Sequence, residues 1–247
     1  MGDIGKKFID KTKKIEINES DQKKGFSPPP LQSPYSEQLE KIDLVEIGDI
    51  KVHEKDITQV INQRKSVRSY LEESLTLEEL SYLLWCTQGV KKIISNTTTK
   101  RIVPSAGSRH PLETYLVINR VKGLPIGLYR YISLEHKLLK IKTNSQMMKK
   151  IVEACNDQQF IAKSALIFIW SANIYRMKWR HGERAYRYIF LDAGHVGQNL
   201  YLAADVIDCG VCAISVFLDD EVNHLVGIDG KTEFVIYMAA IGKSKTS

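Results

Sequence analysis

An uninterrupted apolar run, ALIFIW (Ala165–Trp170), constrains the fold more than any other part of the sequence. A strand with one face in water alternates apolar and polar residues, whereas a continuous run predicts a strand that is covered on both faces. The run is far too short to cross a bilayer, which takes about 20 residues. We therefore predict a central strand between two layers of structure, and no membrane span.

Further strands and helices are predicted on either side of this run. Apolar alternation predicts strands at 113–119, 127–141 (a hairpin), 211–217 and 233–242. Helical spacing predicts helices at 56–65, 76–89, 183–207 and 219–227. Thr76 and Glu79 form a capping box, and Asp219 is the predicted cap of the last helix. Strands and helices alternate without repeats, which predicts an α+β or α/β class with a mixed sheet.

The first 45 residues differ in composition from the rest. They begin rich in Lys, Asp and Glu, and the run Pro28–Pro30 favours an extended conformation. We predict an N-terminal arm at 1–45, either partly disordered or lying on a partner subunit, and a main domain at 46–247. The N-terminus has no apolar signal core, so we expect a cytoplasmic protein.

The charge balance and the cysteines exclude little. The chain has 35 Lys and Arg against 29 Asp and Glu, a balance that suits a phosphate-bearing cofactor or nucleic acid but is also typical of a solvated surface. Cys209 and Cys212 spell C-x-x-C without a second ligand pair nearby. We expect them to be small buried residues where a helix turns into a strand, and we predict no metal site.

The segment RKSVRSY brings Arg64, Lys65 and Arg68 together around the hydroxyl of Ser66. Guanidinium groups and a hydroxyl can surround a phosphate with paired donors. The chain has neither a G-x-G-x-x-G nor a P-loop motif, so a phosphate would have to be bound by other means. A solvated basic turn is the alternative explanation of this segment.

Two further stretches have more than one interpretation. The small residues of PSAGS (Pro104–Ser108) could let the backbone approach a flat ring closely, or could form an irregular loop before a strand. The stretch Tyr175–Tyr188 interleaves aromatic residues with five cations. It could bind single-stranded nucleic acid, line a substrate entrance, or be the solvated start of the long helix.

In their order and spacing, RKSVRSY, PSAGSRHPLETY, GERAYRYIFLDAGHVGQNLYLAA, CAISVF and YMAAIGK resemble the nitroreductase family of flavoproteins. The resemblance is closest to its SagB-like dehydrogenases, some of which oxidise azolines to azoles in peptide maturation. It covers about three quarters of the chain, from Asp56 to Lys243. It implies an α+β fold, a mixed sheet flanked by helices, and an intertwined homodimer with FMN at the subunit interface.

The same resemblance implies roles for individual residues. Arg64, Lys65 and Ser66 would hold the FMN phosphate and ribityl chain, with Lys243 as a second phosphate contact. Arg68 would lie near the pyrimidine edge and stabilise the reduced flavin. The residues expected to border the ring are Pro104, Ser105, Ala106 and Ser108 from the partner subunit, and Ala213, Ile214, Ser215 and Val216 from the end of their strand.

The sequence departs from azoline-oxidising relatives in two places. Arg180-His181 stands where those relatives usually carry Lys-Tyr, and Ser215-Val216 where they tend to carry Gly-Gly. An arginine cannot act as a base, whereas a histidine can, so His181 is the candidate acid or base. The candidate catalytic residues are Arg68, Arg180 and His181.

We therefore expect an FMN-dependent oxidoreductase that uses NAD(P)H or a small organic donor in a ping-pong cycle with a small-molecule substrate. One alternative is an azoline-type dehydrogenase acting on a modified peptide. The other is a flavin-binding or interaction protein without turnover, which the basic stretch Tyr175–Tyr188 would join to nucleic acid or another partner; we consider nucleic acid unlikely.

Overall fold

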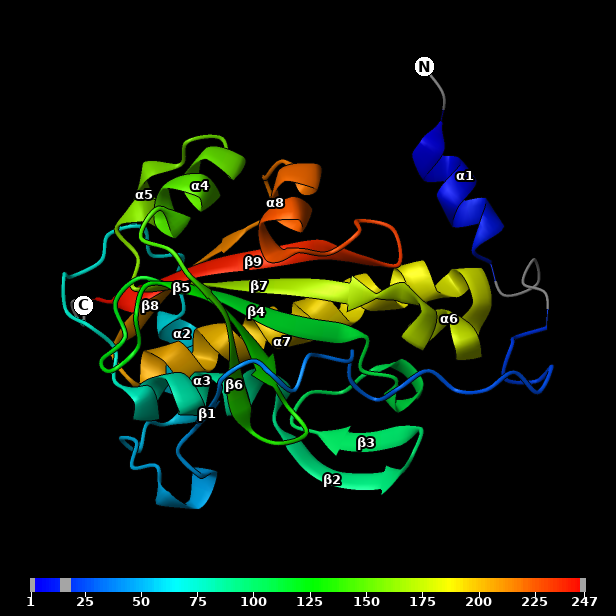
Figure 1. Cartoon of the computed structure of the whole chain (residues 1–247), viewed down its shortest axis with the longest axis horizontal. Helices are drawn as coiled ribbons and strands as arrows, with labels where there is room; N and C mark the ends of the chain where they lie inside the picture. Colours follow the sequence, from blue (N-terminus) through cyan, green and yellow to red (C-terminus); the bar gives the residue numbers. More distant parts are fainter. Residues whose placement is uncertain (1–2, 14–18, 245–247) are drawn as a thin grey trace.

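The computed structural model describes residues 3–13 and 19–244, and its largest feature is a seven-stranded sheet (Figure 1). The strand order is β1-β6-β5-β4-β7-β9-β8. In that order the strands are Lys41–Asp43, Lys137–Thr143, Gly127–Ile132, Leu112–Ile118, Leu166–Asn173, Glu233–Lys243 and Cys209–Ile214. The sheet is therefore wide, with β7 near its middle and β8 at one edge.

Side chains of β7 alternate between two separate hydrophobic clusters. Leu166, Phe168 and Trp170 belong to one cluster, and Ile167 and Ile169 to the other. All five are fully buried. The prediction of a strand covered on both faces is confirmed.

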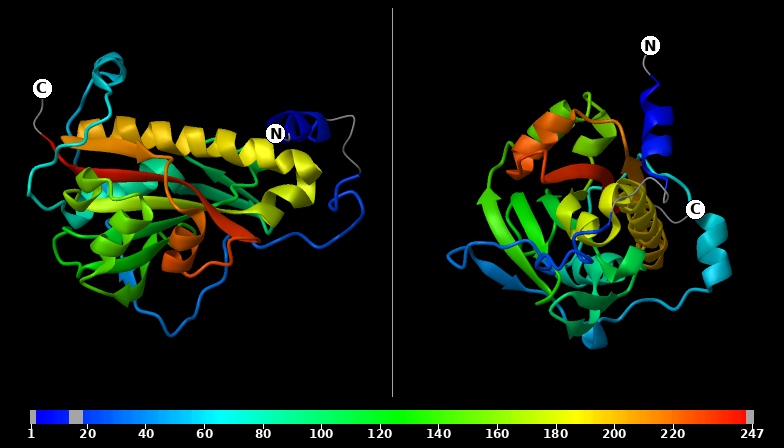
Figure 2. Two further views of the ribbon diagram at one scale, coloured as in Figure 1. Left: turned by 90° about the horizontal axis from the view of Figure 1, so that it is seen from above. Right: turned by 90° about the vertical axis from the view of Figure 1, so that its right-hand side faces the viewer.

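Helices cover the sheet from both sides (Figures 1 and 2). On one face lie α3 (Leu77–Gln88) and the long α7 (Ala185–Val206), which pack against each other. On the other face lie α4 (Met147–Ala154), α5 (Gln159–Ala162) and α8 (Asp219–Val226). This layered arrangement confirms the α+β class.

The strand directions differ from the mixed sheet that we expected. Every pairing between the named strands of the described chain is antiparallel, and parallel contacts occur there only as isolated bridges, such as the one between Ser66 and Val211. One physical reason is that β4, β5 and β6 follow one another through short connections, which suit antiparallel neighbours.

The capping box of α3 is confirmed. The Glu79 amide donates to Thr76 Oγ1 over 3.1 Å, and the Thr76 amide donates to Glu79 Oε2 over 2.9 Å. The cap predicted at Asp219 is wrong by one position, because α8 begins at Asp219 and Leu218 precedes it as the N-cap. Asp219 instead lies in the first turn, where a negative charge favours the helix dipole.

The long helix predicted at 183–207 is shorter than expected. A separate helix, α6 (Ile174–His181), precedes it, and the 3₁₀-helix η4 (Gly182–Arg184) joins the two. Gly182 has φ 55° and ψ −144°, a conformation that other residues rarely adopt. The break at Gly182 places the first half of the basic stretch, with Arg176, Lys178 and Arg180, in a helix of its own.

The remaining short elements were not predicted, except for α2. They are α1 (Ile4–Lys11), η2 (Ile47–Asp49), α2 (Ile57–Gln63), the hairpin of β2 (Val90–Ser95) and β3 (Thr98–Arg101), and η3 (Ala106–Ser108). Asp56 caps α2, as its oxygen Oδ1 accepts from the amides of Thr58 and Gln59.

The segment predicted as an N-terminal arm contributes to the main sheet. β1 pairs with β6, and residues 31–34 bond to side chains of this same chain. α1 lies against the start of α7, where Arg187 donates to Thr12 Oγ1 over 2.6 Å. Residues 1–2 and 14–18 of the arm lie outside the described residues. No helix in the described part of the chain is long and apolar enough to cross a membrane.

Candidate functional site

The segment after α2 runs beside the edge strand β8. The Val67 amide donates to the Val211 carbonyl over 2.8 Å, and Ser66 forms a parallel bridge with Val211. This pairing sets the exposed side chains of Arg64, Lys65, Ser66 and Arg68 along the edge that leads to Ala213. Two motifs separated by more than 140 residues thus form one surface.

Tyr201, on α7, joins the two motifs. Its hydroxyl accepts from the Ala213 amide over 2.9 Å and lies 3.0 Å from Ser66 Oγ. The Arg64 guanidinium lies over its ring, 5.3 Å from the centroid. Tyr201 was not identified from the sequence. Its place on the long helix, next to the apolar inward face, could have indicated a hydroxyl group that points toward the site.

A small cavity of about 50 Å³ opens between these residues. Arg64, Lys65 and Tyr201 line it together with two carboxylates, Asp205 and Asp208. Lys55 Nζ lies 3.0 Å from Asp208 Oδ1 and 3.6 Å from Asp205 Oδ2. Lys55 therefore offsets part of the negative charge of the two carboxylates, and the cations Arg64 and Lys65 give the cavity donors that suit an anion such as a phosphate.

The far end of this surface lies beyond β8. Ile214 is the last residue of the strand and is buried, whereas Ser215 and Val216 follow it and are exposed. Gln158 donates to the Val216 carbonyl over 3.1 Å. Arg68 lies over the ring of Phe160, 5.8 Å from the centroid, so a cation and the exposed residues Ser215 and Val216 occur at the same end.

Lys243 does not join the cluster. Its ammonium group binds Glu79 and donates to the Ile207 carbonyl over 2.9 Å. Burial alone would lower its pKa, but the contact with Glu79 raises it. Lys243 lines a neighbouring cavity of about 220 Å³, and its role as a second phosphate contact stays a prediction.

The loop Pro104–Ser108 has an unusual backbone. Gly107, Ser108 and His110 have φ values of 61°, 53° and 44°. Such conformations are costly outside glycine and are often found at ligand sites. The Ser105 hydroxyl accepts from the His110 amide over 2.9 Å, which closes the turn. Pro104 is exposed, and Ser105, Ala106 and Ser108 are half-buried.

Arg180 and His181 lie against this loop. His181 Nε2 is 3.3 Å from the Ala106 carbonyl oxygen. A Cβ at Gly107 would lie 2.9 Å from Arg180 Nε and from His181 Nε2, so only glycine fits there without a shift. Burial lowers the pKa of His181, and the neighbouring Arg180 adds to this effect. His181 is therefore neutral at pH 7 and able to accept a proton.

The loop and the basic segment lie in different parts of one chain. The loop contacts Asp192 of α7 and the basic segment contacts Tyr201, nine residues further along. At 1.5 Å per residue this is about 13 Å along the helix axis. Figure 1 shows the same separation, with the segment between β3 and β4 near α6 and β8 at the opposite end of the sheet.

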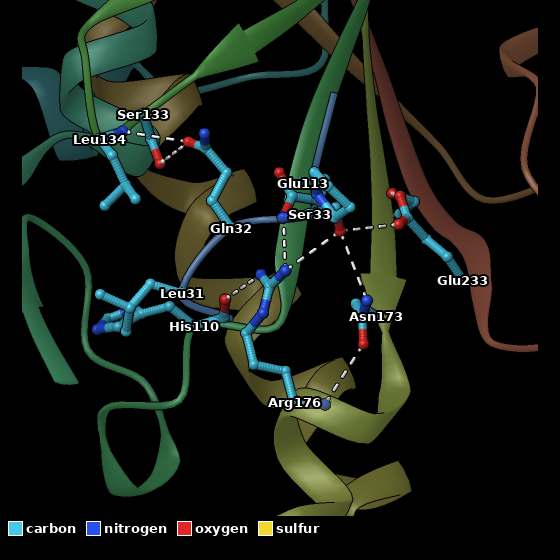
Figure 3. A network of polar contacts seen from close by, with 12 residues as sticks. Leu31, Gln32, Ser33, His110, Glu113, Ser133, Leu134, Asn173, Arg176 and Glu233 are labelled. Carbon is cyan, nitrogen blue, oxygen red and sulfur yellow. Dashed lines mark hydrogen bonds and ion pairs between the residues drawn. The ribbon is translucent and has the colours of Figure 1, made fainter. Parts of the chain in front are cut away.

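The basic stretch Tyr175–Tyr188 is largely engaged within the chain. Arg176 is 1% exposed and forms an ion pair with Glu113 (Figure 3). Lys178 pairs with Glu183 over 2.6 Å, and Arg184 and Arg187 bond to Thr12. These contacts argue against an open cationic groove at this place.

Cys209 and Cys212 are both buried in β8, and burial raises the pKa of Cys209 to about 12. Among residues 3–13 and 19–244, no three His, Cys, Asp or Glu side chains are grouped to hold a metal ion.

Comparisons with known proteins point to one family. The model of the nitroreductase family matches residues 61–243. A protein of Methanocaldococcus jannaschii, whose name assigns it provisionally to the nitroreductases, is 32% identical over 201 residues, which are 81% of this chain and 98% of that protein. The trifolitoxin-processing protein of Rhizobium leguminosarum bv. trifolii is 30% identical over 132 residues, 52% of this chain and 35% of that protein.

Solved structures agree with this assignment. A provisionally named nitroreductase from Anabaena variabilis is 28% identical, with a TM-score of 0.70 over 85% of this chain and 42% of that one. A structure from Desulfovibrio desulfuricans, solved in complex with FMN, shares the fold at 14% identity, with a TM-score of 0.54 over 79% of this chain and 92% of that one. Since the family model spans well over half of the residues and the archaeal relative is matched along almost its whole length, the chain belongs to the nitroreductase family of oxidoreductases.

Proposed function

We propose that the protein is an FMN-dependent oxidoreductase that acts as a homodimer. Hydride would come from NAD(P)H or a small organic donor and pass to a small acceptor in a ping-pong cycle. The observation that carries the proposal is the junction at Tyr201, because it joins the donors suited to a phosphate with a strand end suited to a flat ring.

In this proposal the chain's own residues bind and orient the cofactor. Arg64, Lys65 and Ser66 would hold the phosphate and the ribityl chain. Ala213 to Val216 would face the ring with backbone groups and small side chains. The exposure of Ser66, Ser215 and Val216 supports these roles, since a ligand can reach them.

FMN, when bound, would supply the chemistry of accepting a hydride at one step and returning it at the next. Arg68 would lie where negative charge develops on the reduced ring, and a fixed cation at that place favours reduction. His181, which is neutral at pH 7, could take up or give back a proton of the substrate.

The separation of the two groups of residues supports the proposed homodimer. In a twofold dimer, each patch of one protomer can meet a different patch of its partner, in a reciprocal way. Phe190 and Leu191 lie on α7 close to the loop and are 55% and 59% exposed. An interface over this part of α7 would bring the loop Pro104–Ser108 of one protomer to the basic segment of the other.

Reconstitution with FMN tests the proposal. The purified protein should bind FMN with a flavin absorbance spectrum and elute as a dimer. Under anaerobic conditions NADH or NADPH should bleach that spectrum, and an added nitroaromatic acceptor should restore it. A colourless monomer in the presence of excess FMN would refute the proposal.

A second candidate function is azoline-type dehydrogenation of a modified peptide. The contact of His181 with the Ala106 carbonyl favours it, because the histidine occupies the place of a proton-handling residue in that branch. The similarity to a protein named for trifolitoxin processing adds support. Indifference of the bound flavin to both nicotinamides, with bleaching by an azoline peptide, would favour this candidate over the first.

A further inference from the structure

Asp192 is a buried carboxyl group directly behind the loop Pro104–Ser108. It lies on α7 and is 4% exposed. The Ala106 amide donates to its Oδ1 over 3.4 Å. Its other oxygen, Oδ2, is buried and has no hydrogen-bond partner within the described residues. A buried carboxylate with an unpartnered oxygen is costly, so its presence calls for an explanation.

The loop that Asp192 contacts needs to be held in place. Its conformation is strained at Ser108 and His110, which both have positive φ values. The bond from the His110 amide to Ser105 closes the turn, and His181 contacts the Ala106 carbonyl from the outside. Asp192 contacts the loop at two neighbouring groups, the amide of Ala106 and the side-chain hydroxyl of Ser105.

The groups around Asp192 determine when it is charged. His195 lies one turn further along α7. His110, two residues after the loop, lines a small pocket together with Asp192. From α3 comes Gln88, whose Oε1 accepts from Arg101 of β3 over 3.2 Å. Beyond the loop lie Arg109, Arg180 and His181, the last two from α6.

Only some of these groups change charge near neutral pH. Burial raises the pKa of Asp192 to about 6, against the hydrogen bonds of Ser105 and Ala106 and the charge of His195, which lower it. Burial lowers the pKa of His110 to about 3, so this residue stays neutral. Burial lowers the pKa values of Arg101 and Arg109 to about 10, which leaves both charged.

We propose that Asp192 is a positioning residue whose ionisation sets how firmly the loop Pro104–Ser108 is held for the flavin. The inference rests on the proposed function, since it assumes that this loop borders FMN. When Asp192 is ionised, its bonds to the Ala106 amide and the Ser105 hydroxyl are charge-assisted, and such bonds are roughly twice as strong as neutral ones. When it is protonated, the loop is held more weakly, so FMN affinity falls as the pH drops through the titration of Asp192.

The variant Asp192→Asn isolates this effect. An asparagine keeps the shape and an acceptor oxygen for Ala106, but it cannot ionise. The FMN dissociation constants of wild type and variant should be measured from pH 5 to pH 8 by quenching of flavin fluorescence. The phosphate of FMN itself titrates near pH 6, but this contribution cancels in the ratio of the two constants.

We expect the ratio of the variant's dissociation constant to that of wild type to be near one at pH 5. The ratio should rise to about five at pH 8, because the ionised Asp192 of wild type makes a stronger hydrogen bond than the neutral asparagine does. When both proteins also carry His195→Asn, the step should move to higher pH, because the charge that lowers the pKa of Asp192 is gone. A ratio that stays constant while both proteins bind FMN would overturn the inference and leave the proposed function intact. Complete loss of FMN binding in Asp192→Asn alone, at pH 5 as well as at pH 8, would also overturn the inference only. Failure of the wild type to bind FMN at any pH would overturn both.

Thermal unfolding of the FMN-free proteins gives a second readout. Asp192 binds its proton more tightly folded than unfolded, so it stabilises the fold at low pH and this stability is lost as pH rises through about 6. The melting temperature of wild type should therefore fall relative to that of Asp192→Asn between pH 4 and pH 7. A parallel pH dependence of the two proteins would show that Asp192 does not titrate there and would overturn the inference.

Discussion

Arg176 Nη2 lies 2.7 Å from Glu113 Oε1, and the two side chains are only 1% and 4% exposed. Arg130 binds the other carboxylate oxygen over 3.0 Å. The Ser33 amide donates to Oε1 over 2.7 Å, and Figure 3 shows Ser33 and Glu113 side by side. One carboxylate of β4 therefore holds a strand, a helix and the N-terminal segment together.

Replacing Glu113 with Gln should strongly destabilise the fold. The change leaves two buried guanidinium groups without a counter-charge, and breaking a buried ion pair costs about 3–5 kcal/mol. Urea unfolding measures the loss. Glu153→Gln on α4 is the matched control, since its pair with Lys149 is exposed and long, and it should change stability by no more than about 0.5 kcal/mol. A loss below 1 kcal/mol in Glu113→Gln would contradict this account.

The contribution of Glu113 should depend on pH with a defined sign. Burial alone would raise its pKa, but Arg176 and Arg130 hold it at about 2. A carboxyl with a lowered pKa stabilises the fold above its ordinary range and loses that effect as pH falls toward the folded value. The difference in unfolding free energy between wild type and Glu113→Gln should shrink between pH 5 and pH 2. A constant difference over that range would speak against the ion pair as its source.

Arg64→Ala should weaken FMN binding about 10- to 100-fold. A hydrogen bond to a charged group contributes about 1.5–3 kcal/mol, and each 1.4 kcal/mol corresponds to a factor of ten. Flavin fluorescence after dialysis measures the loss. Lys149→Ala removes the same charge from an exposed site on the other face of the sheet and should leave affinity unchanged. Full FMN retention in Arg64→Ala would remove the phosphate assignment.

His181→Phe should retain FMN and turn over more slowly. The ring keeps its packing against Tyr188 but can no longer carry a proton, and loss of a general acid or base typically costs at least about 100-fold. If the neutral form of His181 is active, the rate of the unmodified enzyme should fall when the pH drops below the lowered pKa of His181. The variant should not show this fall in rate at low pH. An unchanged steady-state rate would leave His181 as a surface residue.

Leu191→Arg should disrupt the dimer and, with it, FMN binding. A charge placed on the exposed apolar part of α7 would have to be buried in the proposed interface, at a cost of several kcal/mol. Size-exclusion chromatography with light scattering measures the mass. Glu153→Arg introduces the same side chain on the opposite face of the sheet and should remain dimeric. A dimeric, flavin-loaded Leu191→Arg protein would place the interface elsewhere.

Local patterns in the sequence predicted the elements that local interactions determine. Thr76 and Glu79 are three residues apart, and their mutual bonds form within one turn. The apolar run of β7 also predicts its own burial, because each residue needs a partner surface on its own side. These features required no knowledge of which distant segments meet.

Features that depend on distant contacts could not be predicted. Ser33 and Glu113 are 80 residues apart, and nothing near Ser33 indicates a buried partner. Tyr201 becomes part of the site only when Ser66 and Ala213 approach it. The ion pair of Lys243 is a further example, because nothing in the sequence near Lys243 indicates that Glu79 binds its ammonium group.

The fastening of residues 31–43 to the sheet also determines which shortened forms of the protein can be prepared. The family model begins at residue 61, which invites expression of that core alone. Such a fragment would lack β1 and the carbonyl groups of Ser33 and Pro34 that accept from Arg130. A buried guanidinium group without those acceptors destabilises the fold and favours insoluble protein, so a shortened form should keep residues 31–43.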